Sequence, residues 1–104
     1  MTTFDDRERG FENKFAHDAE MQFKASARRN RLLAEWAAGI LGKTGPEAAD
    51  YAREVARSDL QEPGDEDVFR KISADLAGRV DEATIRARMA SLLAEARSQL
   101  SLEP

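Results

Sequence analysis

Apolar residues recur at intervals of three or four along most of the chain, which is the spacing of one face of a helix. The first such stripe ends just before Gly42, and glycine is typical of the position that follows a helix. A helix is therefore expected from Ala19 or Glu20 to about residue 41. Its stripe consists of Phe23, Ala27, Leu33, Trp36, Ala37, Ile40 and Leu41.

Three further stripes follow, and residues that start or stop helices bound each of them. Thr44 is a candidate N-cap with Pro46 in the first turn, Glu62-Pro63-Gly64 breaks the chain, Gly78 ends a helix and Asp81 caps the next. The apolar positions are Ala48, Tyr51, Ala52, Val55, Ala56 and Leu60, then Val68, Phe69, Ile72 and Leu76, then Ile85, Met89, Leu92, Leu93, Ala96 and Leu100.

The connections between these stripes are only a few residues long, so consecutive helices are expected to lie antiparallel. The predicted fold class is all-α, a small four-helix bundle with a disordered or mobile N-terminal segment. The bundle domain is expected over residues 19–104 and the segment over residues 1–18. Aromatic and aliphatic side chains predicted in the core are Trp36, Tyr51, Phe69, Ile72 and Leu92.

The first 18 residues are aromatic but lack aliphatic support. Phe4, Phe11 and Phe15 share one face if the segment is helical, yet Leu, Ile and Val are absent before Leu32. Gly10 is expected to interrupt a helix here, at a cost of about 1 kcal/mol. Two interpretations remain open: the rings fold back onto the bundle as core, or they dock into a partner.

Composition and charge narrow the function classes. The 104 residues carry a net charge of -4, and 35% are charged. An acidic chain is repelled by nucleic acid and by anionic membranes, so neither nucleic-acid binding nor membrane insertion is expected. The absence of cysteine excludes disulfides and thiolate chemistry, and fits a reducing compartment such as the cytoplasm.

A basic run stands out against this acidic background. Lys24, Arg28, Arg29 and Arg31 are spaced so that they cluster on a helix. They either form a solvated face or grip an acidic protein surface or phosphates. A nucleic-acid-binding helical domain that uses these four residues therefore stays open as an alternative function.

Three other candidate sites have simpler structural interpretations. Gly42-Lys43-Thr44 resembles part of a phosphate loop, but it follows a helix, and Ala37 stands where the motif needs glycine. A weak adenine-nucleotide contact at Lys43 and Thr44, in a nucleotide-responsive binding module, stays open as an alternative. His17, the single histidine, is expected to be exposed or to serve in capping or pH-sensitive docking. Asp65-Glu66-Asp67 favours a helix N-terminus over a metal site, so no catalytic, metal or cofactor site is predicted.

Several segments together resemble the zeta subunit family of alphaproteobacterial F-type ATP synthases, over essentially the full length. The segments that carry the resemblance are Phe4-Asp5-Asp6-Arg7-Glu8-Arg9, Lys14-Phe15-Ala16-His17-Asp18, Phe23-Lys24-Ala25, Ala27-Arg28-Arg29-Asn30, Leu32-Leu33, Trp36-Ala37-Ala38 and Leu41-Gly42-Lys43. The resemblance implies a four-helix bundle with a mobile inhibitory N-terminus. It also implies a non-enzymatic subunit that blocks ATP hydrolysis by inserting this segment at an interface between the α and β catalytic subunits.

The resemblance also assigns site residues and partners. It places inhibitory contacts on Phe4, Asp5, Asp6, Arg7, Glu8, Arg9, Phe11 and Phe15. The residue pattern itself adds secondary contacts at His17, Lys24, Arg28, Arg29 and Arg31. The implied partners are the α, β and central-stalk γ subunits, at the cytoplasmic face of the inner membrane, with no cofactor. Gly10, Asn13 and Ser26 depart from the family pattern, which would weaken helix formation and so the strength of inhibition.

Overall fold

The computed structural model describes the backbone of residues 3–59 and 65–103, and side chains from residue 18 onward within those ranges. The described residues form four helices: α1 (Thr3–Leu41), α2 (Pro46–Ser58), α3 (Glu66–Asp75) and α4 (Glu82–Ser101). No strand occurs among the described residues. The predicted fold class, an all-α four-helix bundle, is confirmed.

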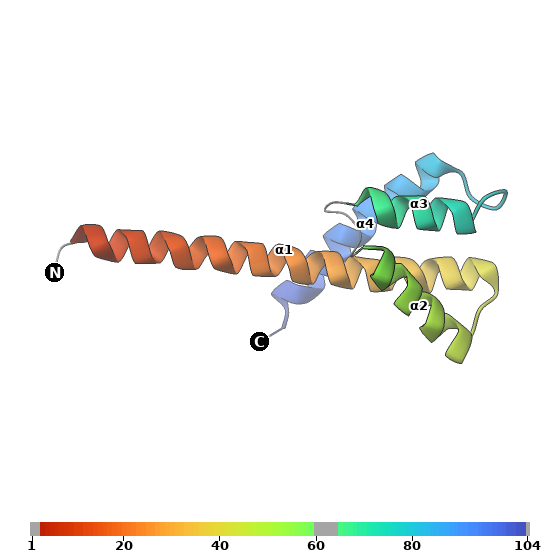
Figure 1. Ribbon diagram of the computed structural model, residues 1–104, viewed down its shortest axis with the longest axis horizontal. Helices are drawn as coiled ribbons and strands as arrows, with labels where there is room; N and C mark the ends of the chain where they lie inside the picture. The colour runs from red at the N-terminus through yellow and green to blue at the C-terminus, as the bar shows by residue number, and fades with distance from the viewer. Residues whose placement is uncertain (1–2, 60–64, 104) are drawn as a thin grey trace.

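Helix α1 is much longer than expected. It begins at Thr3, and Gly10 lies inside it without interrupting it, so the prediction of a break at Gly10 is wrong. A single glycine costs about 1 kcal/mol, which the good helix formers around it offset. In Figure 1, α1 runs the length of the molecule, and its N-terminal part extends past the other three helices. The molecule therefore measures 62 Å along its longest axis but only 26 Å and 22 Å across.

The core forms where α1 meets its partners. The C-terminal part of α1 packs against α2 and α4, and α3 packs against α2 and α4. Four of the five predicted core residues, Tyr51, Phe69, Ile72 and Leu92, are buried, whereas Trp36 is partly buried against the core. The buried residues of the cluster are Leu33, Ala34, Ala37, Ala38, Tyr51, Val55, Val68, Phe69, Ile72, Leu76, Ile85, Met89 and Leu92.

The face of α1 that packs inward differs from the predicted stripe at its N-terminal end. Phe23 is 72% exposed and Ala27 is also exposed, while Ala25 is buried. Phe23 lies ten residues before Leu33, which turns it about 80° away from the buried face. In α2, Ala56 is likewise exposed, whereas Leu60 lies outside the described residues.

The helix ends follow local chemistry, with one correction. Gly42 follows α1 with a φ of 74°, a conformation that glycine adopts without steric cost. Asp81 caps α4, because its carboxylate accepts a hydrogen bond of 2.7 Å from the Thr84 backbone N–H. Thr44 does not cap α2: Gly45 occupies the N-cap position, and no side chain bonds the first turn. Pro46 takes the first helical position as predicted, where a missing N–H costs nothing.

Candidate functional site

The N-terminal part of α1, residues 3–17, extends away from the bundle as a continuation of the same helix (Figure 1). The eight residues assigned to inhibition lie on it, from Phe4 to Phe15, and so does His17. Their side chains lie outside the described part of the structure, so their roles and the mobility of the segment remain predictions. We call residues 3–17 the extension.

Three consecutive residues hold α1 at the point where it enters the bundle. Arg28 pairs with Glu103, just beyond α4. The Arg29 guanidinium donates to the Asp65 carboxylate at the N-cap of α3, at 2.9 Å. The Asn30 amide donates to Asp59, the C-cap residue of α2, at 2.9 Å. We call Arg28, Arg29 and Asn30 the collar, because each residue bonds the end of a different helix.

Arg29 is the buried centre of this collar. Its side chain is 1% exposed, and its Nε atom also donates to the Asn30 side-chain oxygen at 2.9 Å. The hydrogen bond from Arg29 lowers the pKa of the Asp65 carboxyl below its ordinary value, and burial opposes this only in part. A charge buried in this way needs its partner, since removing one member leaves the other uncompensated.

The burial of Arg29 corrects the prediction that it serves as a secondary partner contact. The charge pattern alone placed Arg29 on a surface with its neighbours, but in the structure its side chain is buried and bound to Asp65 at the start of α3. The proposed nucleic-acid patch therefore loses one of its four residues. Of the other three, Lys24 forms an exposed pair with Glu20 at 3.1 Å, and Arg28 is bound to Glu103. Arg31 is exposed and has no partner among the described residues.

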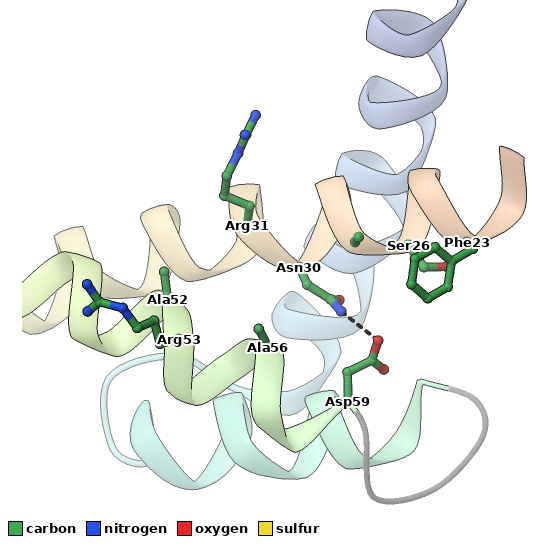
Figure 2. Close-up of a pocket in the computed structure, with 9 residues that line it drawn as sticks. Phe23, Ser26, Asn30, Arg31, Ala52, Arg53, Ala56 and Asp59 are labelled. Atoms are coloured by element: carbon green, nitrogen blue, oxygen red, sulfur yellow. Dashed lines mark hydrogen bonds between the residues drawn. The ribbon is translucent and has the colours of Figure 1, made fainter. Parts of the chain in front are cut away.

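The exposed face of α1 borders a hollow that sequence reasoning missed. It has a volume of about 430 Å³ and lies between α1 and α2. Figure 2 shows Ala52 and Ala56 of α2 facing α1 across it, with Phe23 at one end and the Asn30–Asp59 bond at its base. Its lining consists of Phe23, Ser26, Ala27, Asn30, Arg31, Ala52, Arg53, Ala56 and Asp59. The small side chains at the helix contact are the signal that could have revealed it.

The nucleotide and metal candidates gain no support from the geometry. Lys43 and Thr44 lie in the turn between two helices, and the Lys43 ammonium is 5.9 Å from the centre of the Tyr51 ring. Burial and a hydrogen bond to Asp75 raise the pKa of the Tyr51 hydroxyl. The acidic triplet is engaged with arginines rather than arranged around an ion: Asp65 binds Arg29, and the others bind arginines of α3 and α4.

The described residues contain neither a cluster of potential metal ligands nor a helix able to span a membrane. No group of three or more potential metal ligands is brought together within residues 18–59 and 65–103. Within the same described part of the chain, no helix combines the length and the apolar character needed to cross a membrane.

Comparisons with known proteins show which family has this architecture. A protein known from a solution NMR structure is 52% identical to the chain, and the match covers 78% of this chain and 95% of that one with a TM-score of 0.71. The comparison with curated protein sequences finds no match. The sequence model described as ATPase inhibitor subunit zeta matches residues 1–99. This match confirms the resemblance found in the sequence, and the chain belongs to the ATPase inhibitor subunit zeta family.

Proposed function

We propose that this protein inhibits ATP hydrolysis by the F-type ATP synthase, as a non-enzymatic subunit whose N-terminal segment, residues 1–18, enters an interface between the α and β catalytic subunits. Membership of an inhibitor family supports the inhibitory role. The observation that carries the mechanism is the extension itself, a helix that leaves the bundle and presents residues 3–17 to a partner.

The dimensions of the molecule suit insertion of its N-terminal end alone into an interface between subunits. Residues 3–17 form a rod about 22 Å long at 1.5 Å per residue, narrow enough for a groove between subunits. The bundle behind it spans 26 Å by 22 Å and stops further entry. A helix held between catalytic subunits blocks the conformational cycle that hydrolysis requires. Rotation in the synthesis direction expels it, so inhibition acts in one direction.

The chemistry of the segment fits such a contact. Phe4, Phe11 and Phe15 fill apolar pockets, while Arg7 and Arg9 pair with carboxylates of the catalytic subunits. Asp5, Asp6 and Glu8 lie in the first turns of α1, where negative charge stabilises a helix. The protein acts in the cytoplasm, at the membrane face where the catalytic sector of the synthase projects.

The test is ATP hydrolysis by a purified alphaproteobacterial F-type ATPase, with the full-length protein and a variant that lacks residues 1–18. Full-length protein should inhibit, and the deletion should abolish inhibition while the bundle stays folded. Fluorescence of Trp36, the single tryptophan, reports bundle integrity in both proteins because it packs against the core. Full inhibition by the deleted variant would contradict the mechanism. Equal inhibition of ATP synthesis would contradict its one-way action.

A further inference from the structure

Among residues 18–41 of α1, Phe23 is the large apolar side chain that is exposed to solvent. It is 72% exposed, and Ala27 and Arg31 follow it at intervals of four, so the three residues form one ridge along the helix. We call them the Phe23 ridge. A hollow of about 430 Å³ lies on its α2 side, and another of about 340 Å³ lies toward the C-terminal end of α4. An exposed ring between two concave surfaces is a typical feature of recognition sites.

The hollow on the α2 side has a mostly apolar floor. Ala27 on α1 and Ala52 and Ala56 on α2 line it, and these small side chains leave space that a longer side chain could fill. Arg53 borders the same hollow, and Arg31 extends from α1 at its edge. An amphipathic helix that binds in such a groove inserts apolar side chains that are spaced three and four residues apart.

Arg31 is the charged residue of the ridge that can pair with a partner. The two hollows are bordered by Lys24, Arg28, Arg31 and Arg53, and by two carboxylates, those of Asp59 and Glu103. Asp59 accepts a hydrogen bond from Asn30. Lys24 pairs with Glu20, Arg28 with Glu103 and Arg53 with Asp50, so Arg31 is the one bordering cation that lacks a partner among the described residues. The chain as a whole has a net charge of -4. The local surface is thus complementary to a partner that carries a carboxylate opposite Arg31, beside apolar side chains.

The position of the ridge adds to this argument. Phe23 lies six residues beyond the end of the extension, which is about 9 Å along the same helix axis. A partner that holds the extension as a helix must therefore have its own surface close to Phe23.

We propose that the Phe23 ridge and its two hollows form a second docking surface for the catalytic sector of the ATPase, and that it receives an acidic amphipathic helix of that sector. This inference rests on the proposed function, because the partner is the same. The apolar side chains of the incoming helix contact Phe23, Ala27 and the alanines of α2, and one of its carboxylates pairs with Arg31. The extension then supplies the block, and the ridge supplies part of the affinity.

Two other occupants fit the surface less well. A second copy that met this face with its own would bring no unpaired carboxylate to Arg31, because Asp59 and Glu103 are already bound. The chain's own extension has suitable chemistry, with Phe4 and Phe11 near Asp5 and Asp6, but α1 leads it directly away from the ridge. Reaching back would require the helix to break.

The experiment measures the dissociation constant of the full-length protein for the purified ATPase, together with inhibition of hydrolysis. F23A should raise the dissociation constant at least about tenfold, as truncation of a central aromatic contact does. R31E should raise it several-fold, because it reverses the one rim charge that lacks a partner among the described residues. The matched controls are L102A, at the other large exposed apolar residue, and R57E, on α2 but outside both hollows. Both controls should bind like the unaltered protein, and all four variants should keep its thermal midpoint.

Each other result has a definite meaning. Unchanged binding by both F23A and R31E overturns the docking surface and leaves the proposed function intact. Tighter binding by F23A overturns it in favour of the chain's own extension, since the substitution would release that segment. A dimer that F23A dissociates overturns it in favour of a second copy. Binding without inhibition overturns the proposed function alone, provided F23A still weakens binding, and no binding by the unaltered protein overturns both.

Discussion

The two halves of α1 share one secondary structure but differ in what stabilises it. Residues 29–41 pack against α2 and α4, and their buried face contributes to the core of the bundle. Residues 3–17 extend past the other helices, so their helical state depends on intrinsic propensity and on whatever they contact in a complex (Figure 1). Residues 29–41 therefore anchor α1 in the bundle, and residues 3–17 are available to a partner. Substitutions matched between the halves should separate stability from inhibition.

The largest effect on stability is expected from L33A, in the packed half. Leu33 is fully buried in the core, so the substitution leaves a cavity and should lower the free energy of unfolding by about 2–5 kcal/mol. Chemical denaturation followed by circular dichroism measures this loss. F23A, on the exposed face of the same helix, should change the free energy by no more than about 0.5 kcal/mol. Similar losses in both variants would show that the assignment of the buried face is wrong.

The collar should give the next largest effect. D65N removes the charge that faces the buried Arg29 and should lower the free energy of unfolding by about 1–3 kcal/mol, since half of the Asp65 side chain is already exposed to water. E103Q, which weakens the more exposed pair with Arg28, should cost less than about 1 kcal/mol. Denaturation midpoints of the two variants measure this difference. Equal losses in the free energy of unfolding for D65N and E103Q would mean that the burial of Arg29 does not set how much its bond to Asp65 stabilises the fold.

Two glycine substitutions compare the halves directly. G39A lies in the packed half, where an added Cβ meets open space, and should raise the free energy of unfolding by about 0.5–1 kcal/mol. G10A lies in the extension and should leave bundle unfolding unchanged. It should instead raise helix content and strengthen inhibition up to about fivefold, because less ordering remains to be done on binding. If G39A strengthened inhibition and G10A did not, the proposed division between the halves would fail.

The smallest predicted effect is a pH dependence of the collar. The folded-state pKa of Asp65 is lower than its ordinary value of 3.8, because Arg29 donates to its carboxylate. The carboxylate therefore stabilises the fold fully above pH 3.8, and this contribution is lost as pH falls through the lower folded pKa. The stability difference between the unaltered protein and D65N should stay constant near neutral pH and shrink below pH 3.8. A difference that grows on acidification would contradict the assigned pair.

The spacing of apolar residues predicted α4 better than it predicted the long helix α1. In α4, Asp81 as the cap and the stripe from Ile85 to Leu100 were visible in the sequence, because the cap and the apolar spacing agree. In α1, the approximate apolar stripe that ends at Leu41 placed Phe23 on the packed face. Arg29 was assigned to the surface because it is charged. Both assignments are reversed in the structure, where Ala25, Arg29 and Leu33 define the inward face at intervals of four.

The candidate site was less visible in the sequence than the fold. Asp65 is 36 residues from Arg29, and Asp59 is 29 residues from Asn30, so neither pair has a local pattern that marks it. The hollow beside Phe23 depends on how closely α1 approaches α2, which the sizes of Ala52 and Ala56 influence but do not fix. The roles of Phe4 to Phe15 came from family resemblance and remain predictions.

The collar also has a mechanical meaning. Arg28, Arg29 and Asn30 follow one another on α1, yet each is tied to the end of a different helix. Tension applied along α1 from its free end passes through these three residues, which divide it among α4, α3 and α2. Because the ties lie within one turn of a continuous helix, no single short helix has to resist the pull by itself. A pull on the free end of α1 is therefore shared by the other three helices.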